Sequence, residues 1–222
     1  MLTRDLAFVL AIKPYREGHL LVVLLSKRHG LIRAVAHKAQ QAKSLLHSTC
    51  QPFVEADFLL RLSDNGLADI LQAETLDAHS ALRMDMVKAG FAAACSEWLM
   101  QAAGQDGLAR PATAYACYQD GLRGLARMEV PALTYLRFLF CTLHEAGLAL
   151  NAAEMASWRL SPAAQRLLAG VVASEASTTV SGNARDATNE LLDAVSSWVF
   201  DQTGIVLKSL KIAIQLALGS EG

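Results

Sequence analysis

The chain has few cysteines and none of the short motifs that mark common catalytic or metal sites. Its four cysteines, Cys50, Cys95, Cys117 and Cys141, include no Cys-x-x-Cys pair and no Cys/His pair at ligand spacing. The sequence also lacks a Gly-x-x-x-x-Gly-Lys-Ser/Thr phosphate loop, a Gly-x-Ser-x-Gly nucleophile turn and a His-Glu-x-x-His zinc motif. We therefore predict no catalytic activity, no metal and no cofactor. We expect Cys95, Cys117 and Cys141, which lie in helix-like stretches, to be buried apolar side chains, and we expect no disulfide framework.

Long apolar runs are missing as well. Hydrophobic residues make up 53% of the chain, yet charged residues interrupt every apolar stretch before the roughly eighteen residues that a membrane helix needs. The first residues do not read as a secretory leader, because Asp5 and Lys13 bracket too short an apolar run. From the sequence we expect a protein of the reducing cytoplasm.

Positive charge is concentrated near the amino terminus. Residues 1–47 contain eight Lys and Arg against two acidic residues, a net charge of +6, so the remaining residues carry −7 of the total of −1. Four of the six histidines also lie in this segment. This asymmetry predicts a module that faces a polyanion, attached to an acidic body.

The basic segment has the pattern of a small β-barrel. Short runs rich in Val, Ile and Leu are separated by turn residues that include Pro14, Gly18, Gly30 and the Asn65-Gly66 pair. The predicted strands cover residues 8–12, 20–25, 31–36, 53–62 and 67–73. A longer connection joins the third strand to the fourth, which is the layout of a five-stranded Greek-key barrel of the OB type. We predict that residues 1–77 form this domain.

Beyond residue 77 the sequence becomes rich in Ala and Leu at helical spacing. Apolar residues recur every three or four positions, and Pro131 and Pro162 occupy plausible first-turn positions. The predicted helices cover residues 84–103, 111–128, 131–146, 162–168, 186–202 and 208–218, with a polar loop at 174–183. The fold class expected is α+β, with an OB-type barrel followed by an all-α domain at 78–222.

At this level of detail the chain resembles a known family. The segments that carry the resemblance are Lys13-Pro14-Tyr15-x-Glu17, Lys27-Arg28-His29-Gly30-Leu31-Ile32, Val35-Ala36, Lys43-Ser44 and Gln51-Pro52-Phe53. Together they resemble the amino-terminal domain of RecO, the bacterial recombination mediator. Two later segments, 139–148 and 203–211, resemble that family's central helix and the start of its closing helix.

The resemblance implies a function. It implies binding of single- and double-stranded DNA, annealing of complementary strands, and help in loading the recombinase onto DNA coated by single-strand-binding protein, in the RecF pathway. The implied partners are DNA, RecR and the acidic, hydrophobic tail of single-strand-binding protein. That tail would need an apolar groove rimmed by basic residues on the helical domain.

Two departures from the family pattern bear on this implication. Gln40 and Gln41 stand where family members usually carry arginines, so fewer cations are present to bind phosphate and DNA affinity is expected to be modest. Many members also hold zinc through paired Cys-x-x-Cys motifs after the central helix, and this chain lacks them.

The candidate site residues fall into two groups. The candidates for phosphate contact, with Tyr15 as a base-stacking residue, are Lys13, Tyr15, Arg16, Lys27, Arg28, Arg33, Lys38 and Lys43. The candidates for partner binding are Arg123, Arg127 and Arg137, of which Arg137 stands where the resemblance implies a tail-contacting arginine.

Each group has a plain alternative. An ordinary solvated surface explains the basic residues equally well on composition alone, and the four amino-terminal histidines read as solvated or phosphate-facing. A protein-interaction scaffold that binds DNA weakly or not at all is therefore the competing function. An RNA-binding OB protein is disfavoured because it gives no reason for the matched carboxyl-terminal helices.

Overall fold

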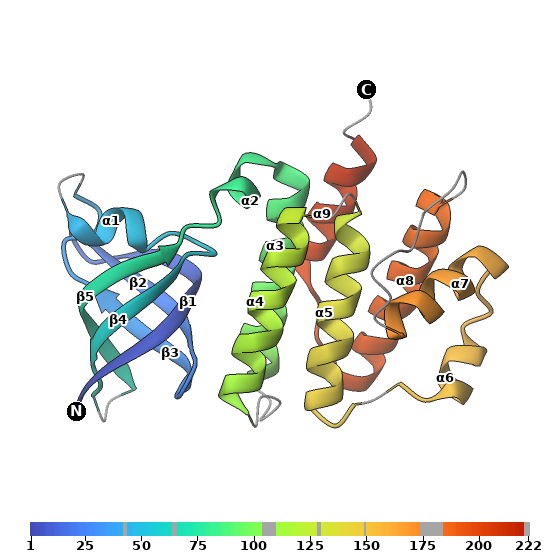
Figure 1. Ribbon diagram of the computed structural model, residues 1–222, viewed down its shortest axis with the longest axis horizontal. Coiled ribbons are helices and arrows are strands. Elements are labelled where there is room, and N and C mark those ends of the chain that lie inside the picture. Colours follow the sequence, from blue (N-terminus) through green and yellow to red (C-terminus); the bar gives the residue numbers. More distant parts are fainter. Residues whose placement is uncertain are drawn as a thin grey trace.

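The computed structural model describes residues 1–41, 44–63, 66–103, 110–127, 130–148, 150–173 and 184–219. A β-barrel is followed by a layer of helices that lies beside it, with the amino terminus at the outer side of the barrel (Figure 1). The barrel is closed in the order β1-β2-β3-β5-β4. The predicted fold class, an OB-type barrel followed by helices, is confirmed.

Four of the barrel strands are longer than the apolar runs predicted for them, whereas β4 is shorter than its predicted range of 53–62. They are β1 (Leu2–Tyr15), β2 (His19–Ser26), β3 (Gly30–Ala36), β4 (Glu55–Arg61) and β5 (Leu67–Asp77), with the short helix α1 (Leu45–Thr49) between β3 and β4. Antiparallel pairing joins β1 to β2 and β4, β2 to β3, and β4 to β5, whereas β3 and β5 pair in parallel. This parallel pair closes the barrel after the long connection.

Two features of β1 explain why it extends beyond the predicted ends. Its first residues include Asp5, a buried carboxylate that hides the apolar pattern and accepts hydrogen bonds from the Ser26 hydroxyl and, at 3.1 Å, from the Arg28 backbone N–H. Its last residues include Pro14, which usually ends a strand. Strand β4 pairs with β1 only as far as Phe8, so one edge of β1 is open at Pro14, where a proline is tolerated.

Helices make up most of the rest of the described chain. They are α2 (Ser80–Met84), α3 (Met86–Ala102), α4 (Pro111–Arg127), α5 (Pro131–Glu145), α6 (Ala152–Ser157), α7 (Pro162–Val172), α8 (Ala184–Thr203) and α9 (Lys208–Gly219). Pro131 and Pro162 lie in the first turns of α5 and α7, as predicted. The short helices α1, α2 and α6 are absent from the prediction, because about one turn of helix leaves little periodicity to detect. The predicted polar loop at 174–183 lies outside the described residues.

Strand β1 contributes to two hydrophobic cores. Successive side chains of a strand point to opposite faces, and here Ala7 and Val9 point into the barrel whereas Phe8 and Leu10 point toward the helices. The barrel core includes Phe58, and the helical core is built on large side chains such as Trp98 and Tyr118. The barrel is therefore packed against the helices through a shared strand.

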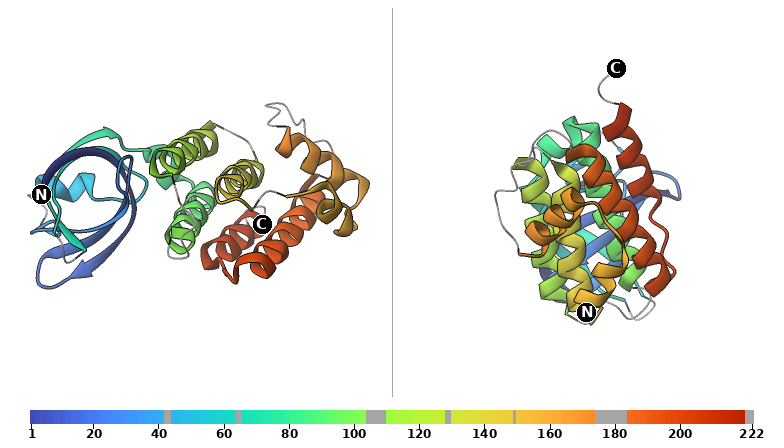
Figure 2. Two further views of the ribbon diagram at one scale, coloured as in Figure 1. Left: turned by 90° about the horizontal axis from the view of Figure 1, so that it is seen from below. Right: turned by 90° about the vertical axis from the view of Figure 1, so that its right-hand side faces the viewer.

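A polar contact accompanies this packing at α4. The buried carboxylate of Glu55 in β4 accepts hydrogen bonds from the Tyr115 hydroxyl at 2.5 Å and from the Gln119 side-chain amide at 2.9 Å. Burial, together with the neighbouring Glu55 carboxylate, raises the pKa of Tyr115, so its hydroxyl stays protonated and donates. The Phe8 ring lies 4.8 Å from the Tyr115 ring and 5.1 Å from the Tyr118 ring. Figure 2 shows the barrel end-on beside the helices that these contacts join.

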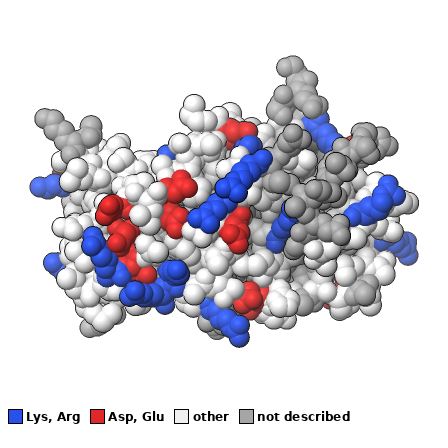
Figure 3. Space-filling model, viewed as in Figure 1, with Lys and Arg blue, Asp and Glu red and all other residues white. Residues whose placement is uncertain are grey.

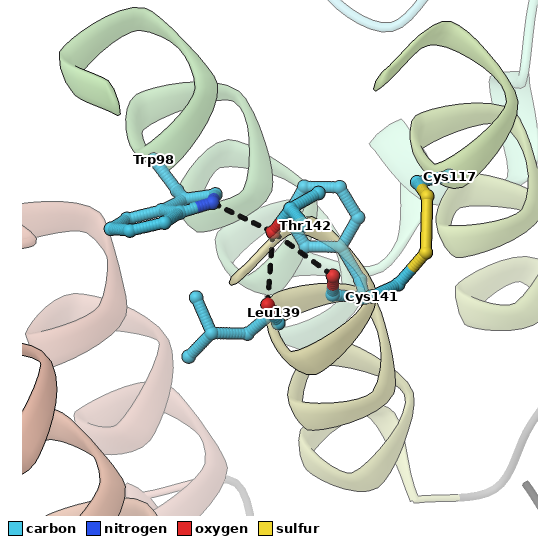
Figure 4. Close-up of a disulfide and its surroundings, with 6 residues drawn as sticks. Trp98, Cys117, Leu139, Cys141 and Thr142 are labelled. Carbon is cyan, nitrogen blue, oxygen red and sulfur yellow. Dashed lines mark hydrogen bonds between the residues drawn. A yellow bond between two sulfur atoms is a disulfide. The ribbon is translucent and has the colours of Figure 1, made fainter. Parts of the chain in front are cut away.

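A disulfide links α4 to α5. It joins Cys117 to Cys141, and Figure 4 shows it beside the Thr142 hydroxyl, which accepts a hydrogen bond of 2.7 Å from the Trp98 indole N–H. The expectation that all four cysteines are isolated is wrong for this pair, because spacing along the chain does not reveal that two helices bring their cysteines together. Cys95 is free and buried, as predicted. Cys50 is also free and buried, and its burial raises the pKa of its thiol to about 12.

Reduction of this disulfide should destabilise the protein. The bond closes a loop with a sequence separation of 24 residues, for which the smaller chain entropy of the cross-linked unfolded state predicts a stabilisation of about 3 kcal/mol. Urea unfolding of the oxidised protein, with and without dithiothreitol, measures the difference. The Cys117→Ser/Cys141→Ser variant is the control and should not respond to dithiothreitol. An equal response of both proteins would contradict the prediction.

Removal of the Tyr115 hydroxyl should also lower stability. Tyr115→Phe leaves the buried Glu55 carboxylate with one fewer donor, which costs about 1–3 kcal/mol in the free energy of unfolding. Tyr15→Phe is a matched control, since it makes the same chemical change in a half-buried side chain at the end of β1. Denaturant midpoints at constant slope give the comparison, and an equal decrease for the two variants would disprove a special role for the Glu55 contact.

Candidate nucleic-acid interface

The turn between β1 and β2 meets the segment after β3 at one end of the barrel. We call Tyr15, Arg16, His19, His37 and Lys38 the hairpin-tip cluster. Arg16 and Lys38 have left-handed backbone angles, with φ of 47° and 55°, and both side chains are exposed. The Arg16 guanidinium carbon lies 5.3 Å from the centre of the Tyr15 ring. Cations and aromatic rings therefore share one small exposed surface.

Hydrogen bonds join the two halves of this cluster. The Lys38 backbone N–H donates to His19 Nδ1 at 2.9 Å. Gln40 donates twice, from its backbone N–H to the Gly18 carbonyl at 3.2 Å and from its side-chain amide to the His19 carbonyl at 2.6 Å. Gln40, which stands where the resemblance implies an arginine, thus holds the segment after β3 onto the β1–β2 turn.

Two further predicted residues lie on the outward face of the same strands. Register pairs Lys13 with Leu21, and Arg33 with Val23, while their chain neighbours Val22 and Ala34 point into the barrel core. Residues directly opposite one another share a face of the sheet. Lys13 and Arg33 are both exposed there. They extend the positive surface from the hairpin-tip cluster along β1 and β3.

Lys27 and Arg28 lie apart from this surface. Both are in the β2–β3 turn, at the other end of β3, which spans 7 residues or on the order of 20 Å. The Lys27 ammonium sits 5.8 Å from the centre of the Tyr115 ring, at the junction with α4. The Arg28 guanidinium lies 3.8 Å from the Asp5 carboxylate. The structure therefore divides the predicted DNA-binding residues into two groups with Arg33 between them, and Lys43 lies outside the described residues.

The strands β4 and β5, which adjoin β1 and β3, carry acidic side chains beside their cations. On β4 and β5, Asp57 pairs with Arg4 at 3.3 Å, and Asp69 lies 3.9 Å from Arg61. Glu74 is exposed and lies opposite Asp57 in the register. Acidic side chains gather over the barrel on the face shown in Figure 3. The barrel thus has a cationic side on β1–β3 and a side on β4–β5 where the cations are matched by carboxylates.

The predicted partner residues are only partly brought together. Arg123 and Arg127 are exposed on α4 and line a shallow hollow of about 410 Å³ with Asp120 and Gly124. Arg137 is half-buried on α5 and does not line that hollow.

Sequence reasoning missed an apolar groove among α5, α8 and α9. It has a volume of about 390 Å³ and is lined mainly by apolar side chains that include Leu139, Phe200 and Val206. Phe200 on α8 and Val206 in the α8–α9 connection are 50% and 42% exposed, and their exposure follows from helix packing that spacing along the chain does not reveal. The charged lining residues are Asp193, Asp201 and Lys211.

Metal clusters and membrane helices are absent from the described part of the chain. Within those ranges, no group of three or more His, Cys, Asp or Glu side chains is placed to hold a metal ion. None of the described helices is both long and apolar enough to cross a bilayer.

Comparison with known proteins gives consistent matches. The family described as "Recombination protein O N terminal" matches residues 1–79. The chain is 32% identical to the DNA repair protein RecO of Oceanobacillus iheyensis over 97 residues, which span 44% of this chain and 37% of that protein. It is 30% identical to the protein of the same name from Moorella thermoacetica over 145 residues, or 64% of this chain and 51% of that protein.

A longer match settles the family. The chain is 31% identical to the DNA repair protein RecO of Xanthomonas euvesicatoria over 198 residues, which cover 83% of this chain and 80% of that protein. This match includes helices as well as the barrel, whereas the match to the Oceanobacillus protein covers little more than a third of that relative's length. With the closed five-stranded barrel and the helices that follow it, these matches show that the chain belongs to the RecO family.

Proposed function

We propose that this protein is a non-enzymatic mediator of DNA repair and recombination that binds single- and double-stranded DNA. Its RecO-family relatives support the repair role. The single observation that supports this binding site is the uneven charge of the barrel. Lys13, Arg16, Arg33 and Lys38 are exposed on its β1–β3 side. On its β4–β5 side, carboxylates pair with Arg4 and Arg61. A polyanion is attracted to the first side and repelled by the exposed carboxylates of the second.

The proposed mechanism is charge neutralisation followed by bridging. Two complementary strands repel each other through their phosphates, and cations that occupy those phosphates lower the repulsion and favour annealing. The same neutralisation of phosphates would help to load the recombinase onto DNA coated by single-strand-binding protein. Residues 1–77 would bind the DNA and residues 78–222 the protein partners, RecR and the tail of single-strand-binding protein. Such work places the protein in the cytoplasm, at the nucleoid.

A protein-interaction scaffold with weak or no DNA binding is the second candidate. The specific observation in its favour is Gln40, whose side-chain amide donates an intramolecular hydrogen bond to the His19 carbonyl and adds no charge to the surface. DNA titration decides between the two functions.

Reversal of charge on the β1–β3 side should weaken DNA binding. We expect Arg33→Glu/Lys38→Glu to lower the affinity for fluorescent single-stranded DNA at least tenfold at low salt. The slope of log affinity against log salt should become shallower by about 1.4, or about 0.7 for each phosphate that the variant no longer neutralises. Fluorescence anisotropy at several salt concentrations measures both quantities.

Arg4→Glu/Arg61→Glu is the matched control. It makes the same change in net charge on the β4–β5 side, where both arginines already face carboxylates, so we expect a much smaller decrease in affinity. An equal decrease for the two variants would show that only net charge matters and would overturn the proposed face. Negligible binding by the wild type at low salt would favour the scaffold.

The acidic tail of single-strand-binding protein is proposed to bind beside Arg123 and Arg127. The apolar groove suits the hydrophobic end of the tail, but its charged lining is two aspartates and one lysine, which does not favour the acidic part. Two exposed arginines on α4 do favour it.

Substitution on α4 should therefore weaken tail binding. We expect Arg123→Glu and Arg127→Glu each to lower the affinity for a fluorescent tail peptide about tenfold, because each replaces attraction by repulsion. Arg166→Glu, at an exposed position on α7, is the control and should bind as the wild type does. If Phe200→Asp abolishes binding while both α4 variants retain it, the groove is the site and the proposal for α4 is wrong.

A further inference from the structure

Three aromatic rings form a row across the hairpin-tip cluster. Tyr15 and His19 are direct cross-strand partners at the end of the β1–β2 hairpin, so their side chains leave the same face of the sheet. His37 follows β3, and its ring centre lies 5.0 Å from that of His19. The row thus crosses β1, β2 and the end of β3 in the order Tyr15, His19, His37.

The geometry of the histidine pair leaves ring surface available. The two imidazole planes meet at 76°, an edge-to-face arrangement, so the ring that presents its edge does not use its own faces in this contact. The His37 side chain is 54% exposed. Whichever ring presents its edge, at least one face of the His37 ring is not used by His19.

Both imidazole rings are held in place by hydrogen bonds. His19 Nδ1 accepts the Lys38 backbone N–H at 2.9 Å, and His37 Nε2 lies 2.8 Å from the Asp69 carboxylate of β5. Arg16 is in contact with the Tyr15 ring. Rings that are already oriented lose little conformational entropy when a ligand stacks on them.

The charges around the row favour an anionic ligand with flat groups. Arg16 and Lys38 flank the rings, and Lys13 is two residue pairs further along the same face. The acidic groups nearby are Glu17 in the turn and Asp69, whose carboxylate is already shared by His37 and Arg61. Aromatic rings between phosphate-binding cations are the arrangement by which single-stranded DNA is held without sequence preference.

We propose that Tyr15, His19 and His37 form a stacking platform for unpaired bases, which makes the barrel prefer single-stranded DNA to duplex. This inference rests on the proposed DNA-binding function and adds to it the part of the DNA that is recognised. In a duplex the base faces are covered by their neighbours, so only the phosphates remain for this surface. On a single strand both the phosphates and the base faces are accessible, and the platform contacts both.

An oligonucleotide without bases separates stacking from charge. We compare a fluorescent oligothymidylate with an oligonucleotide of the same length built from abasic sites, which carries the same phosphates. The wild type should bind the oligothymidylate about tenfold more tightly, within the range expected for one stacked base. His37→Leu should reduce this ratio severalfold, whereas His37→Phe, which keeps a flat ring, should retain it.

Further measurements guard the interpretation. His37 is exposed, so thermal unfolding should be unchanged in both His37 variants. Their salt slope should also match the wild type, because no phosphate-binding cation is removed. His144→Leu, at an exposed position on α5, is a control for the removal of a surface histidine and should keep the wild-type ratio.

The outcomes distinguish this inference from the function on which it rests. Tight binding of both oligonucleotides with equal affinity would overturn the stacking platform and leave DNA binding by charge intact. An unchanged ratio in His37→Leu would also overturn the platform. Failure of the wild type to bind either oligonucleotide at low salt would overturn both proposals.

Discussion

The double-sided burial of β1 is the constraint on which the rest of the structure depends. Most barrel strands in contact with solvent need only one apolar face, but β1 must fill the barrel with Ala7 and Val9 and the helical interface with Phe8 and Leu10. A shift of one residue in its register would exchange these faces. The register therefore fixes two things together, the packing inside the barrel and the seating of α4 against Phe8. A bulge between Val9 and Ala11 shifts the β1–β2 register by one residue, and the pairing beyond it, such as Lys13 with Leu21, aligns the outward face of the hairpin.

The polar contacts around this strand divide into two kinds. At the α4 junction, the Glu55 carboxylate is buried and bound by two neutral donors, Tyr115 and Gln119. At the hairpin tip, the contacts are made by backbone groups and histidine nitrogens that lie close to solvent. The first kind contributes to the cohesion of barrel and helices, whereas the second orders a surface without burying its cations. The cations of the tip remain available to an external anion.

Much of the fold can be predicted from the sequence, and particular residues explain what cannot. Short β-branched runs between turn residues indicate the five strands, and Pro131 and Pro162 indicate two helix starts within a residue. The ends of β1 could not be predicted, because the hydrogen-bond partners of Asp5 and the open strand edge at Pro14 depend on contacts between residues that are distant in the sequence. Of the candidate site, the charge asymmetry indicates a cationic amino-terminal domain, but it reveals neither which side of the barrel is cationic nor that Lys27 and Lys38 lie apart. The separation of Lys27 from Lys38 depends on strand register and on the position of α4. In the same way, the contact of Cys117 with Cys141 depends on how the helices pack.

Gln40 shows how the absence of one charge changes the kinetics of an encounter. An arginine at this position would add to the long-range field that accelerates the approach of a polyanion. The glutamine adds nothing to that field, but its amide ties the segment after β3 to the His19 carbonyl before any ligand arrives. Compared with an arginine at this position, the glutamine is expected to make association with a polyanion slower and less sensitive to ionic strength. The segment after β3 then loses less conformational entropy when the polyanion binds. In the proposed binding of DNA, selectivity would then depend less on the rate of association and more on the fit of the bound state.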